Sequence, residues 1–294
     1  MPATRPHVSP HLLLALTAFF WAAHWIVARA VHPYVSPVSL AFWRWVAAIA
    51  FLAPVAAPIL AREWPKVRAA WLPILFFGTG STVLYNAIGY VGIKQSTATN
   101  AVLFQSVTPA LIPLFAYALF RERIRARQAA GFALSFLGVL AIVLRLDAQT
   151  FTALRLNPGD LWLLANVALW ALYTACLRWR PKDLDPLAFM LAVMLAGMLT
   201  GLPAYAIDYA AGGRFEANWG SVLGTLYLGL FPSVICYWMW NRGVAEVGPA
   251  RAGVYLHLIP LFGALMAVAL LGEELRLYHV VGIVLILLGI RWVG

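Results

Sequence analysis

The chain has 294 residues, of which 63% are hydrophobic and 11% are charged, and its mean hydropathy is +0.82. A soluble domain carries about 25% charged residues, so this composition excludes a single soluble core and indicates segments of about 20 apolar residues that cross a bilayer. One N-terminal secretion signal does not explain the composition, because the apolar segments recur along the whole sequence.

Ten apolar segments follow one another, and we expect each to form a transmembrane helix of an all-α polytopic membrane protein. The breaks between them fall at prolines and charged clusters, such as "REWPKVR" (62–68) and "RWRPKDLDP" (178–186), which are typical of turns at a membrane surface. The connections are too short to hold a separate soluble domain. The predicted spans cover residues 12–31, 38–60, 71–93, 98–120, 128–144, 161–177, 187–207, 222–240, 254–271 and 280–292.

The basic residues predict the orientation, because cytoplasmic loops carry an excess of Lys and Arg. If the N-terminus is cytoplasmic, 14 of the 21 Lys and Arg side chains lie on the cytoplasmic side, six lie outside and Arg44 lies within a span. Both termini are therefore expected in the cytoplasm. The net charge of +10 then faces an anionic lipid leaflet, so the predicted partner of these charges is the bilayer and not a nucleic acid.

The second half of the sequence repeats the first half. The segment "SVTPALIPLFAYALFRERI" (106–124) aligns with "HLIPLFGALMAVALLGEEL" (257–275). The two segments are 151 residues apart, and four glycine pairs share that separation, whereas matching pairs earlier in each half are 149 residues apart. The matching pairs are Pro109 and Pro260, Glu122 and Glu273, Gly78 and Gly229, Gly92 and Gly243, Gly131 and Gly282, Gly138 and Gly289, and, at the shorter separation, Trp21 and Trp170, Arg29 and Arg178, Pro37 and Pro186, and Pro54 and Pro203.

Each repeat holds five predicted spans, within residues 1–148 and residues 149–294. Because five is an odd number, the second repeat enters the membrane inverted relative to the first, which is a hallmark of secondary transporters. Two similar units of opposite orientation form one gate on each side of the membrane, with the substrate near the midplane between them. The alternative is an old duplication that is retained only for packing.

Two five-span halves, each with a "P…E" pattern in its fourth span and a "G…LG" pattern in its fifth, resemble the EamA-type drug/metabolite transporter superfamily over nearly the entire chain. The aromatic first span, "FFWAAHWIVARAV" (19–31), is similar to that of bacterial aromatic amino acid exporters. The resemblance implies a ten-helix exporter in the cell inner membrane with both termini cytoplasmic, which agrees with the charge distribution. We expect the protein to be a monomer.

The candidate substrate site consists of aromatic and polar side chains inside the predicted spans, where polar groups are costly. Residues three and four positions apart in the first span share one helix face, and the sixth span repeats that face. Aromatic faces suit a flat apolar side chain or a cation. Alternatively, the rings pack between helices or lie at the headgroup level. The site residues of this set are Trp21, His24, Trp25, Tyr85, Trp170, Tyr173 and Tyr237.

Polar side chains in other spans complete the candidate site. We expect Asn86, Gln105 and His257 to hydrogen-bond the carboxylate and ammonium groups of an amino acid, although His24 and His257 are equally interpreted as packing residues. Arg44 in "AFWRWVAA" either offsets a substrate carboxylate or bonds to backbone carbonyls and reaches toward the interface.

Prolines, glycines and one glutamate carry structural predictions. Prolines inside the spans remove a backbone hydrogen bond and are expected to kink the helices, whereas glycines in the third span allow close helix approach. Glu122 is expected to form a structural ion pair with Arg121 or Arg123. The prolines are Pro109, Pro113, Pro232 and Pro260, and the glycines are Gly78, Gly80, Gly89 and Gly92.

The remaining features decide between function classes. No P-loop sequence, metal-site spacing or catalytic constellation is present, so neither ATP coupling nor a membrane enzyme is indicated, and no cofactor or metal is expected. A channel or receptor remains an alternative, since it would differ in its kinetics and not in its composition. The favoured function is export of neutral, hydrophobic or aromatic amino acids by alternating access, with other small metabolites or drugs as the alternative substrates. No Asp or Glu lies deep inside a predicted span, so transport is expected to be gradient-driven or to couple to protons through His24 or His257.

Overall fold

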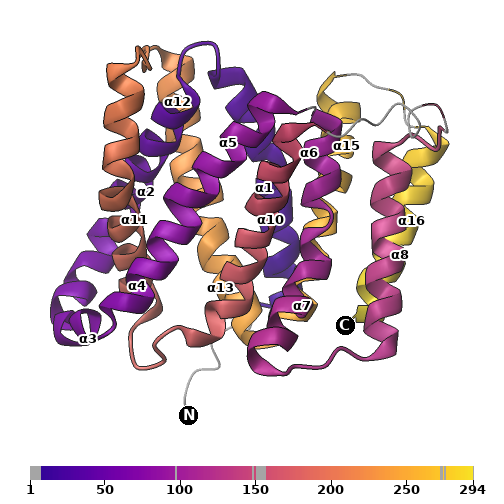
Figure 1. Ribbon diagram of the computed structural model, residues 1–294, viewed down its shortest axis with the longest axis horizontal. Coiled ribbons are helices and arrows are strands. Elements are labelled where there is room, and N and C mark those ends of the chain that lie inside the picture. The colour runs from indigo at the N-terminus through magenta and orange to yellow at the C-terminus, as the bar shows by residue number, and fades with distance from the viewer. Residues whose placement is uncertain are drawn as a thin grey trace.

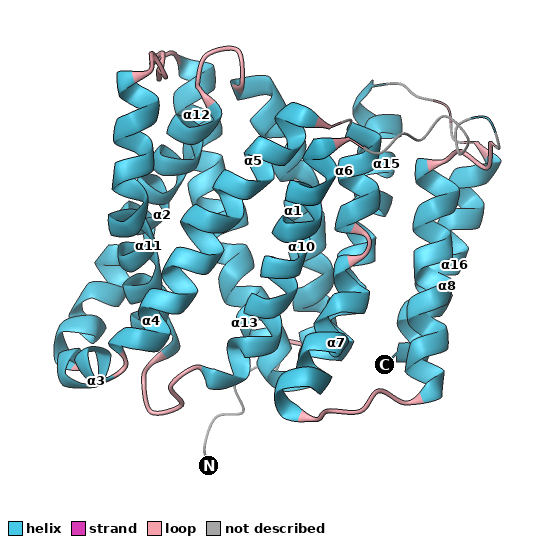
Figure 2. Ribbon diagram, viewed as in Figure 1, coloured by secondary structure: helices cyan, strands magenta, loops and turns pink. Residues whose placement is uncertain are grey.

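The computed structural model describes residues 8–96, 98–147, 149, 157–271, 274 and 276–293, and this part of the chain consists of helices joined by turns and loops (Figures 1 and 2). Its one β-type contact is an isolated bridge between Val35 and Phe215. The helical segments are α1 (Pro10–Val31), α2 (Pro37–Arg62), α3 (Trp64–Ala69), α4 (Trp71–Gly78), η1 (Thr79–Leu84), α5 (Tyr85–Gln95), α6 (Ala98–Gln105), α7 (Thr108–Phe120), α8 (Ala126–Val143), α10 (Pro158–Cys176), η2 (Leu177–Trp179), α11 (Pro186–Ala210), α12 (Trp219–Leu228), η3 (Gly229–Ile235), α13 (Cys236–Val247), α14 (Pro249–Gly253), η4 (Val254–His257), α15 (Leu258–Leu271) and α16 (Leu277–Val293).

All ten predicted spans fall on helical segments, and seven helical runs in the described residues are long and apolar enough to cross a membrane. α16 is shorter, at 17 residues. The predicted spans 71–93 and 222–240 are each interrupted by a π-helical turn, and 254–271 begins with a 3-10 turn. The exact count of ten spans therefore stays a prediction. α1 begins and α16 ends at the same side of the bundle (Figure 1).

Helix starts follow the chemistry of their first residues. Proline occupies the first turn of α1, α2, α10 and α11, where its missing N–H has no intrahelical partner to lose. The side chain of Ser36 accepts a hydrogen bond from the Ser39 N–H, and that of Asp185 accepts from the Leu187 N–H, so both helices are capped.

The predicted span 98–120 is divided in the structure. α6 ends at Gln105 and α7 begins at Thr108, so that Pro109 lies in the first turn of a new helix instead of kinking a continuous one. The reason is the same missing N–H, which costs nothing at a helix start. Pro113 lies inside α7, and Pro232 lies inside the π-helical segment η3.

Glycines bring backbones into direct contact, as the sequence predicts for Gly78 and Gly92. A Cβ added to Gly78 would lie 2.7 Å from the Val193 carbonyl oxygen, and one added to Gly92 would lie 2.9 Å from the side chain of Leu163. Gly80 differs from these two, because no atom lies within 4 Å of the position its Cβ would take. Small residues thus set the helix spacing, as in other membrane bundles.

The pair α8 and α16 shows this contact most clearly. Added Cβ atoms on Gly131 and Gly138 would each lie 2.7 Å from a carbonyl oxygen of α16, that of Gly289 and that of Gly282 respectively. The glycine nearer the start of α8 meets the glycine nearer the end of α16, so the two helices are antiparallel. They stand side by side at one end of the bundle (Figure 1).

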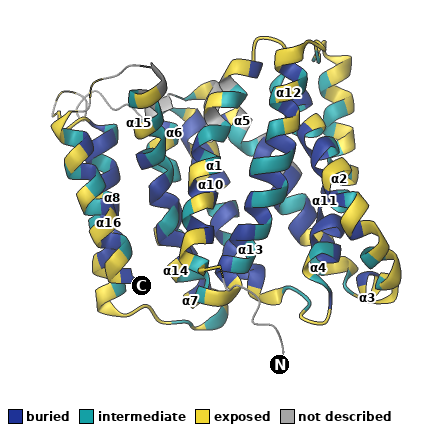
Figure 3. Ribbon diagram, turned by 180° about the vertical axis from the view of Figure 1, so that it is seen from behind, coloured by how far each residue is buried: buried dark blue, intermediate teal, exposed yellow. Residues whose placement is uncertain are grey.

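Helices from the first and second parts of the chain interleave. α1 packs against α13, where Leu14 meets Gly243, and α10 packs against α5, where Leu163 meets Gly92. Buried residues face the interior of the bundle, whereas exposed ones cover its outer faces (Figure 3). Large apolar side chains such as Leu199 and Ile207 are among the exposed ones, which is expected of a surface in contact with lipid.

Carboxylates hold both ends of the α2–α11 pair. At the end of α2, Glu63 accepts hydrogen bonds from the Asp185 N–H at 2.7 Å and from the Lys66 ammonium at 3.1 Å. Near the end of α11, the Asp208 carboxylate accepts from the hydroxyls of Ser36 at 2.6 Å and Ser39 at 3.1 Å. Each helix therefore ends in a carboxylate that binds the start of the other.

The predicted ion pair of Glu122 has a different partner from the one expected. Glu122 pairs with Arg178, which follows α10, and not with Arg121 or Arg123. Arg121 ends α7 with a positive φ of 59°, and its guanidinium lies over the Tyr117 ring instead. The pair therefore joins the two parts of the chain. The matching Glu273 lies outside the described residues.

We predict that Gly138→Ala destabilises the protein by about 1–3 kcal/mol, because the new methyl group meets the Gly282 carbonyl oxygen at 2.7 Å. The measurement is the melting temperature of the purified protein in detergent. The matched control is Gly263→Ala in α15, where no atom lies within 4 Å of the added Cβ and helix propensity alone should raise stability slightly. Equal melting temperatures for the two variants would contradict the close contact.

We predict that the stabilising effect of Glu63 depends on pH. The N–H of Asp185 and the Lys66 ammonium lower the pKa of Glu63 from its ordinary value of 4.5. A carboxyl group whose pKa is lowered by folding stabilises the folded state above its unfolded pKa, and this stabilisation is lost as the pH falls through the folded pKa. The melting-temperature difference between wild type and Glu63→Gln should thus be full near pH 7 and shrink below about pH 4.5. A difference that does not change with pH would refute the ionised cap.

Candidate functional site

Five of the predicted aromatic residues meet at the centre of the bundle, and we call this group the aromatic cluster. The rings of Trp21 and Trp170 lie 5.3 Å apart in an edge-to-face arrangement, and Trp170 stacks on Tyr173 at 5.0 Å. Tyr85 lies 5.4 Å and Tyr237 lies 5.7 Å from the Trp170 ring. Trp170 therefore contacts the other four members, which come from α1, α5, α10 and α13.

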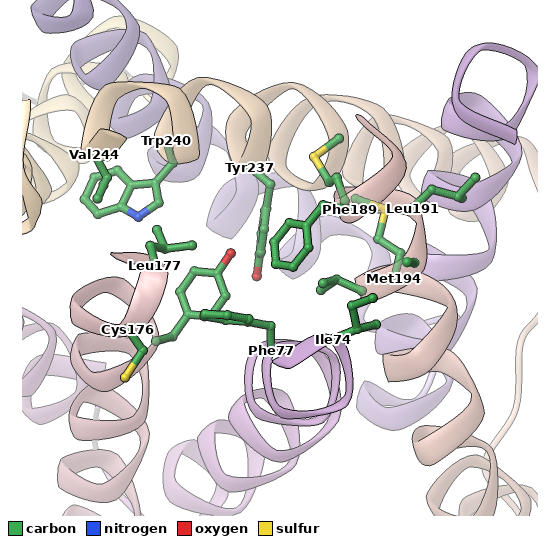
Figure 4. Packing of buried hydrophobic residues seen from close by; sticks show 14 of the residues in the cluster. Ile74, Phe77, Cys176, Leu177, Phe189, Leu191, Met194, Tyr237, Trp240 and Val244 are labelled. Atoms are coloured by element: carbon green, nitrogen blue, oxygen red, sulfur yellow. The ribbon is translucent and has the colours of Figure 1, made fainter. Parts of the chain in front are cut away.

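Three further rings extend the cluster that the sequence predicted. Trp240, one helical turn after Tyr237, lies 5.4 Å from Trp21, and Trp45 lies 5.5 Å from Tyr237. Phe77 packs edge-to-face on Tyr173 at 5.5 Å, and Figure 4 shows it below Tyr237 and Phe189. The three-residue spacing from Tyr237 was a signal for Trp240, whereas no sequence pattern singles out Phe77.

The two π-helical segments supply carbonyl acceptors to the cluster. Trp21 Nε1 donates a hydrogen bond to the Pro232 carbonyl oxygen in η3 at 3.1 Å, and the Tyr237 hydroxyl donates to the Ser81 carbonyl oxygen in η1 at 3.4 Å. Ser81 and Pro232 are 151 residues apart, so they occupy matching positions of the repeat. π-helical turns are rare and often mark functional sites.

A basic group lies beside the cluster. Arg44 Nη1 is 3.3 Å from Nε2 of His24, and its guanidinium lies 5.0 Å from the centre of the Trp45 ring. Arginine has only donors, so His24 Nε2 accepts this bond and carries no proton. Arg44 is 5% exposed, which excludes the interpretation that it reaches the aqueous interface.

The predicted amide contacts are made within the protein. Asn86 donates to the Thr82 carbonyl oxygen, and Gln105 Nε2 donates to Asn166 Oδ1 at 3.2 Å. Asn166 in turn donates to the Tyr85 carbonyl oxygen, which links the Gln105 amide to the backbone of a cluster residue. These bonds engage one donor of each amide within the protein.

His257 lies apart from the aromatic cluster. Its Nε2 is 2.9 Å from the Ser106 carbonyl oxygen and its Nδ1 is 2.6 Å from the Ser135 hydroxyl. Since a carbonyl can only accept, Nε2 carries the proton and Nδ1 accepts from Ser135. Both ring nitrogens are thus occupied, and a substrate contact of His257 stays a prediction. The side chain of Trp25 lies outside the described part of the structure.

A small cavity lies next to Tyr237, between α2, η1, α10, α11 and α13. Its free volume is about 10 Å³, which is room for about one water molecule and far below the roughly 300–1,000 Å³ of a ligand pocket. The structure therefore shows the site closed by its own side chains. The lining residues are Trp45, Ser81, Thr82, Tyr173, Phe189, Met190, Val193, Met194, Tyr237 and Asn241.

A model of the EamA-like transporter family matches the chain twice, over residues 8–144 and residues 157–294. The chain belongs to the EamA-like transporter family. It is therefore a multi-pass membrane protein of a family that transports small molecules. Within the residues that the structure describes, no group of three or more His, Cys, Asp and Glu side chains is placed to hold a metal ion.

Relatives cover nearly the whole chain. An uncharacterized transporter of Bacillus subtilis, YyaM, is 25% identical over 97% of this chain and 93% of its own length. An uncharacterized transporter of Archaeoglobus fulgidus is 27% identical, with 95% of each chain covered. A WAT1-related chloroplastic protein of Arabidopsis thaliana is 23% identical over 94% of this chain and 67% of its own length.

A solved crystal structure shares the fold. It superposes with a TM-score of 0.79 and covers 97% of both chains at 20% sequence identity. At this identity the likeness shows the arrangement of the helices and leaves the substrate open.

We predict that Ser135→Ala lowers the stability of the protein by about 1–3 kcal/mol, because it leaves Nδ1 of the buried His257 without its hydrogen bond. The control is Thr174→Val, which removes a buried hydroxyl that has no partner in the structure and should leave stability unchanged or raise it. Thermal unfolding of both purified variants in detergent measures the difference. A loss of stability in Thr174→Val alone would contradict the stabilising hydrogen bond between Ser135 and His257.

Proposed function

We propose that the EamA-like family member with this aromatic cluster is a secondary transporter that exports neutral, hydrophobic or aromatic amino acids and related metabolites across the cell inner membrane by alternating access. The observation that carries the proposal is the aromatic cluster itself. Its rings come from both repeats, and Trp170 of the second repeat contacts Trp21 and Tyr85 of the first. A movement of one repeat against the other would separate these rings and open space between them.

The proposal includes ten spans in two inverted repeats, residues 1–148 and 149–294, with both termini cytoplasmic. The two matches to the family model support this division. The contacts that exchange between the repeats support the inversion: Gly78 approaches the Val193 carbonyl, and the matching Gly229 approaches the carbonyl of Arg44, which matches Val193. α1 begins and α16 ends on the same side of the bundle, which agrees with an even number of spans (Figure 1).

The chemistry of the site favours the proposed substrates. Aromatic rings bind a flat apolar side chain through edge-to-face and offset-stacked contacts, each of about 0.5–1.5 kcal/mol beyond the area buried. The cavity adjoins Phe189, Met190 and Met194, and methionine adapts its shape to different ligands. This combination suits a range of apolar side chains better than a single rigid substrate.

Export of other small metabolites or drugs is the second candidate function. It is favoured by the small free volume of the site, since the shape of the open cavity depends on side chains that must move. The relatives of Bacillus subtilis and Archaeoglobus fulgidus are named only as transporters, so they support transport and leave this alternative open.

The test is counterflow in proteoliposomes of the purified full-length protein. Vesicles preloaded with unlabelled phenylalanine should accumulate labelled phenylalanine with saturation and without a proton gradient, and leucine and methionine should compete. Conductance without saturation would show a channel. Exchange of other metabolites but of no amino acid would establish the second candidate, and strict dependence on a proton gradient would direct attention to His24 and His257.

Variants of the cluster give the matching prediction. Tyr85→Ala and Trp170→Ala should reduce exchange to below about a tenth of the wild-type rate, because each removes a ring from the centre of the cluster. Trp64→Ala, at a surface tryptophan that is 55% exposed, is the control and should exchange normally. Size-exclusion chromatography checks that all three fold. Normal exchange by both cluster variants would remove these residues from the site.

A further inference from the structure

Arg44 is a buried charge without a counter-charge. It lies in the eighth position of α2, is 5% exposed, and none of the ion pairs in the described residues includes it. Its side chain donates a hydrogen bond to His24, which offers no negative charge. A lone charge inside a bilayer is expensive and is retained mainly where it acts on a ligand or an ion.

Three buried donors lie in or next to the aromatic cluster. Arg44 Nε, Trp45 Nε1 and Trp240 Nε1 are buried and have no acceptor among the residues that the structure describes. All three are groups that only donate, so no rotation of their side chains lets one satisfy another. Arg44 and Trp45 are consecutive on α2, and Trp240 contacts Trp21 of the cluster. Arg44 and Trp45 therefore hold two neighbouring donors that an acceptor on a ligand would satisfy.

Comparison of the two repeats shows that this excess of hydrogen-bond donors belongs to one side of the site. At the separation of 149 residues, Arg44 matches Val193 and His24 matches Tyr173. The two positions are equivalent in space as well, since the carbonyl oxygens of Arg44 and Val193 face Gly229 and Gly78, which match each other. A basic group thus occupies the first repeat where the second has an apolar one. If this position served only helix packing, valine would be suitable in both repeats.

We propose that Arg44 Nε and Trp45 Nε1, assisted by the Arg44–His24 pair, bind the carboxylate of the transported molecule, and that the apolar cavity on the Val193 side receives its side chain. This inference rests on the proposed function and names the group that a substrate must carry. A carboxylate has two acceptor oxygens and a negative charge, so it satisfies both donors and offsets the guanidinium. An amine or a neutral amide supplies no such charge.

The polarity of the site also fixes the orientation of the substrate. Arg44 is closer to the start of α2 than to its end, and His24 is closer to the end of α1 than to its start. The carboxylate therefore points toward the side of the membrane where α1 and α2 are joined. The side chain of the substrate points toward α11, which supplies Phe189, Met190, Val193 and Met194 to the cavity.

The experiment measures the competition of four phenyl compounds with labelled phenylalanine counterflow in proteoliposomes: phenylalanine, phenylalanine amide, 3-phenylpropanoate and 2-phenylethylamine. Wild type should be inhibited by the two carboxylates and not by the amide or the amine. Arg44→Gln should raise the KM for phenylalanine about 10- to 100-fold, the loss expected for one charge-assisted hydrogen bond, with a smaller change in kcat. It should also abolish the discrimination between acid and amide.

Two further variants separate a binding role from a structural one. Trp45→Phe retains an aromatic ring but removes the indole N–H together with part of the buried ring system, so it should raise the KM, and its melting temperature records the cost of the lost volume separately. Arg68→Gln removes the same charge at an exposed position of α3 and should leave KM and discrimination unchanged. An unchanged KM and unchanged discrimination in both Arg44→Gln and Trp45→Phe would overturn the carboxylate site, although the proposed function would stand.

A thermal-shift arm keeps the inference testable if wild type does not exchange phenylalanine. In that case the proposed function fails for this substrate, and the melting temperature of wild type is measured with 3-phenylpropanoate, with 2-phenylethylamine and with chloride at equal concentrations. Stabilisation by the carboxylate alone, lost in Trp45→Phe and Arg44→Gln, would support the site independently. Equal shifts for carboxylate and amine, a shift with chloride as large as that with the carboxylate, or no shift at all, would overturn it.

Discussion

The lack of hydrogen-bonding partners in hydrocarbon is the constraint on which this structure depends. Every backbone N–H and C=O in the bilayer needs a partner within the protein, so the chain is helical across its apolar segments. Where the helix departs from regular geometry, at η1 and η3, the carbonyls of Ser81 and Pro232 accept from Tyr237 and Trp21. The irregular turns and the aromatic cluster therefore require each other.

The same constraint accounts for what the sequence could predict. Apolar length predicted the positions of the helices, because a span must cross a fixed thickness, and the glycines of the third span predicted the close contacts of Gly78 and Gly92. The face of Trp21, Trp170 and Tyr173 followed from helical periodicity. The breaks were harder to predict: Pro109 has the sequence appearance of an interior proline but starts α7, since the two placements differ only in the local path of the chain.

Contacts between distant segments lay beyond sequence reasoning. Glu122 has two arginines beside it in sequence, yet it pairs with Arg178, because the end of α7 turns Arg121 toward Tyr117. Likewise Asn86, Gln105 and His257 were recognised as polar residues in spans, but not the partners that occupy them. A single sequence identifies a costly group and does not say whether the protein or a ligand satisfies it.

The site differs from its surroundings in how its buried polar groups are hydrogen-bonded. Gln105 and His257 are bonded within the protein, and so is the carboxylate of Asp160, which accepts from Ser96 and Asn100. Among the described residues, Arg44 and Trp45 retain donors without acceptors at a position where one repeat has a basic residue and the other has valine. A frame built from two similar halves thus holds a centre that is chemically different on its two sides.

The π-helical turns also determine helix phase. A π turn holds one residue more than an α turn, so everything after it is rotated by about 100° relative to a regular helix. Tyr85 follows such a turn directly, and Tyr237 is the second residue after the other. Loss of a single residue from η3 would therefore leave α13 intact as a helix but would turn Tyr237 and Trp240 away from Trp170. The direction in which the aromatic face points thus depends on one inserted residue.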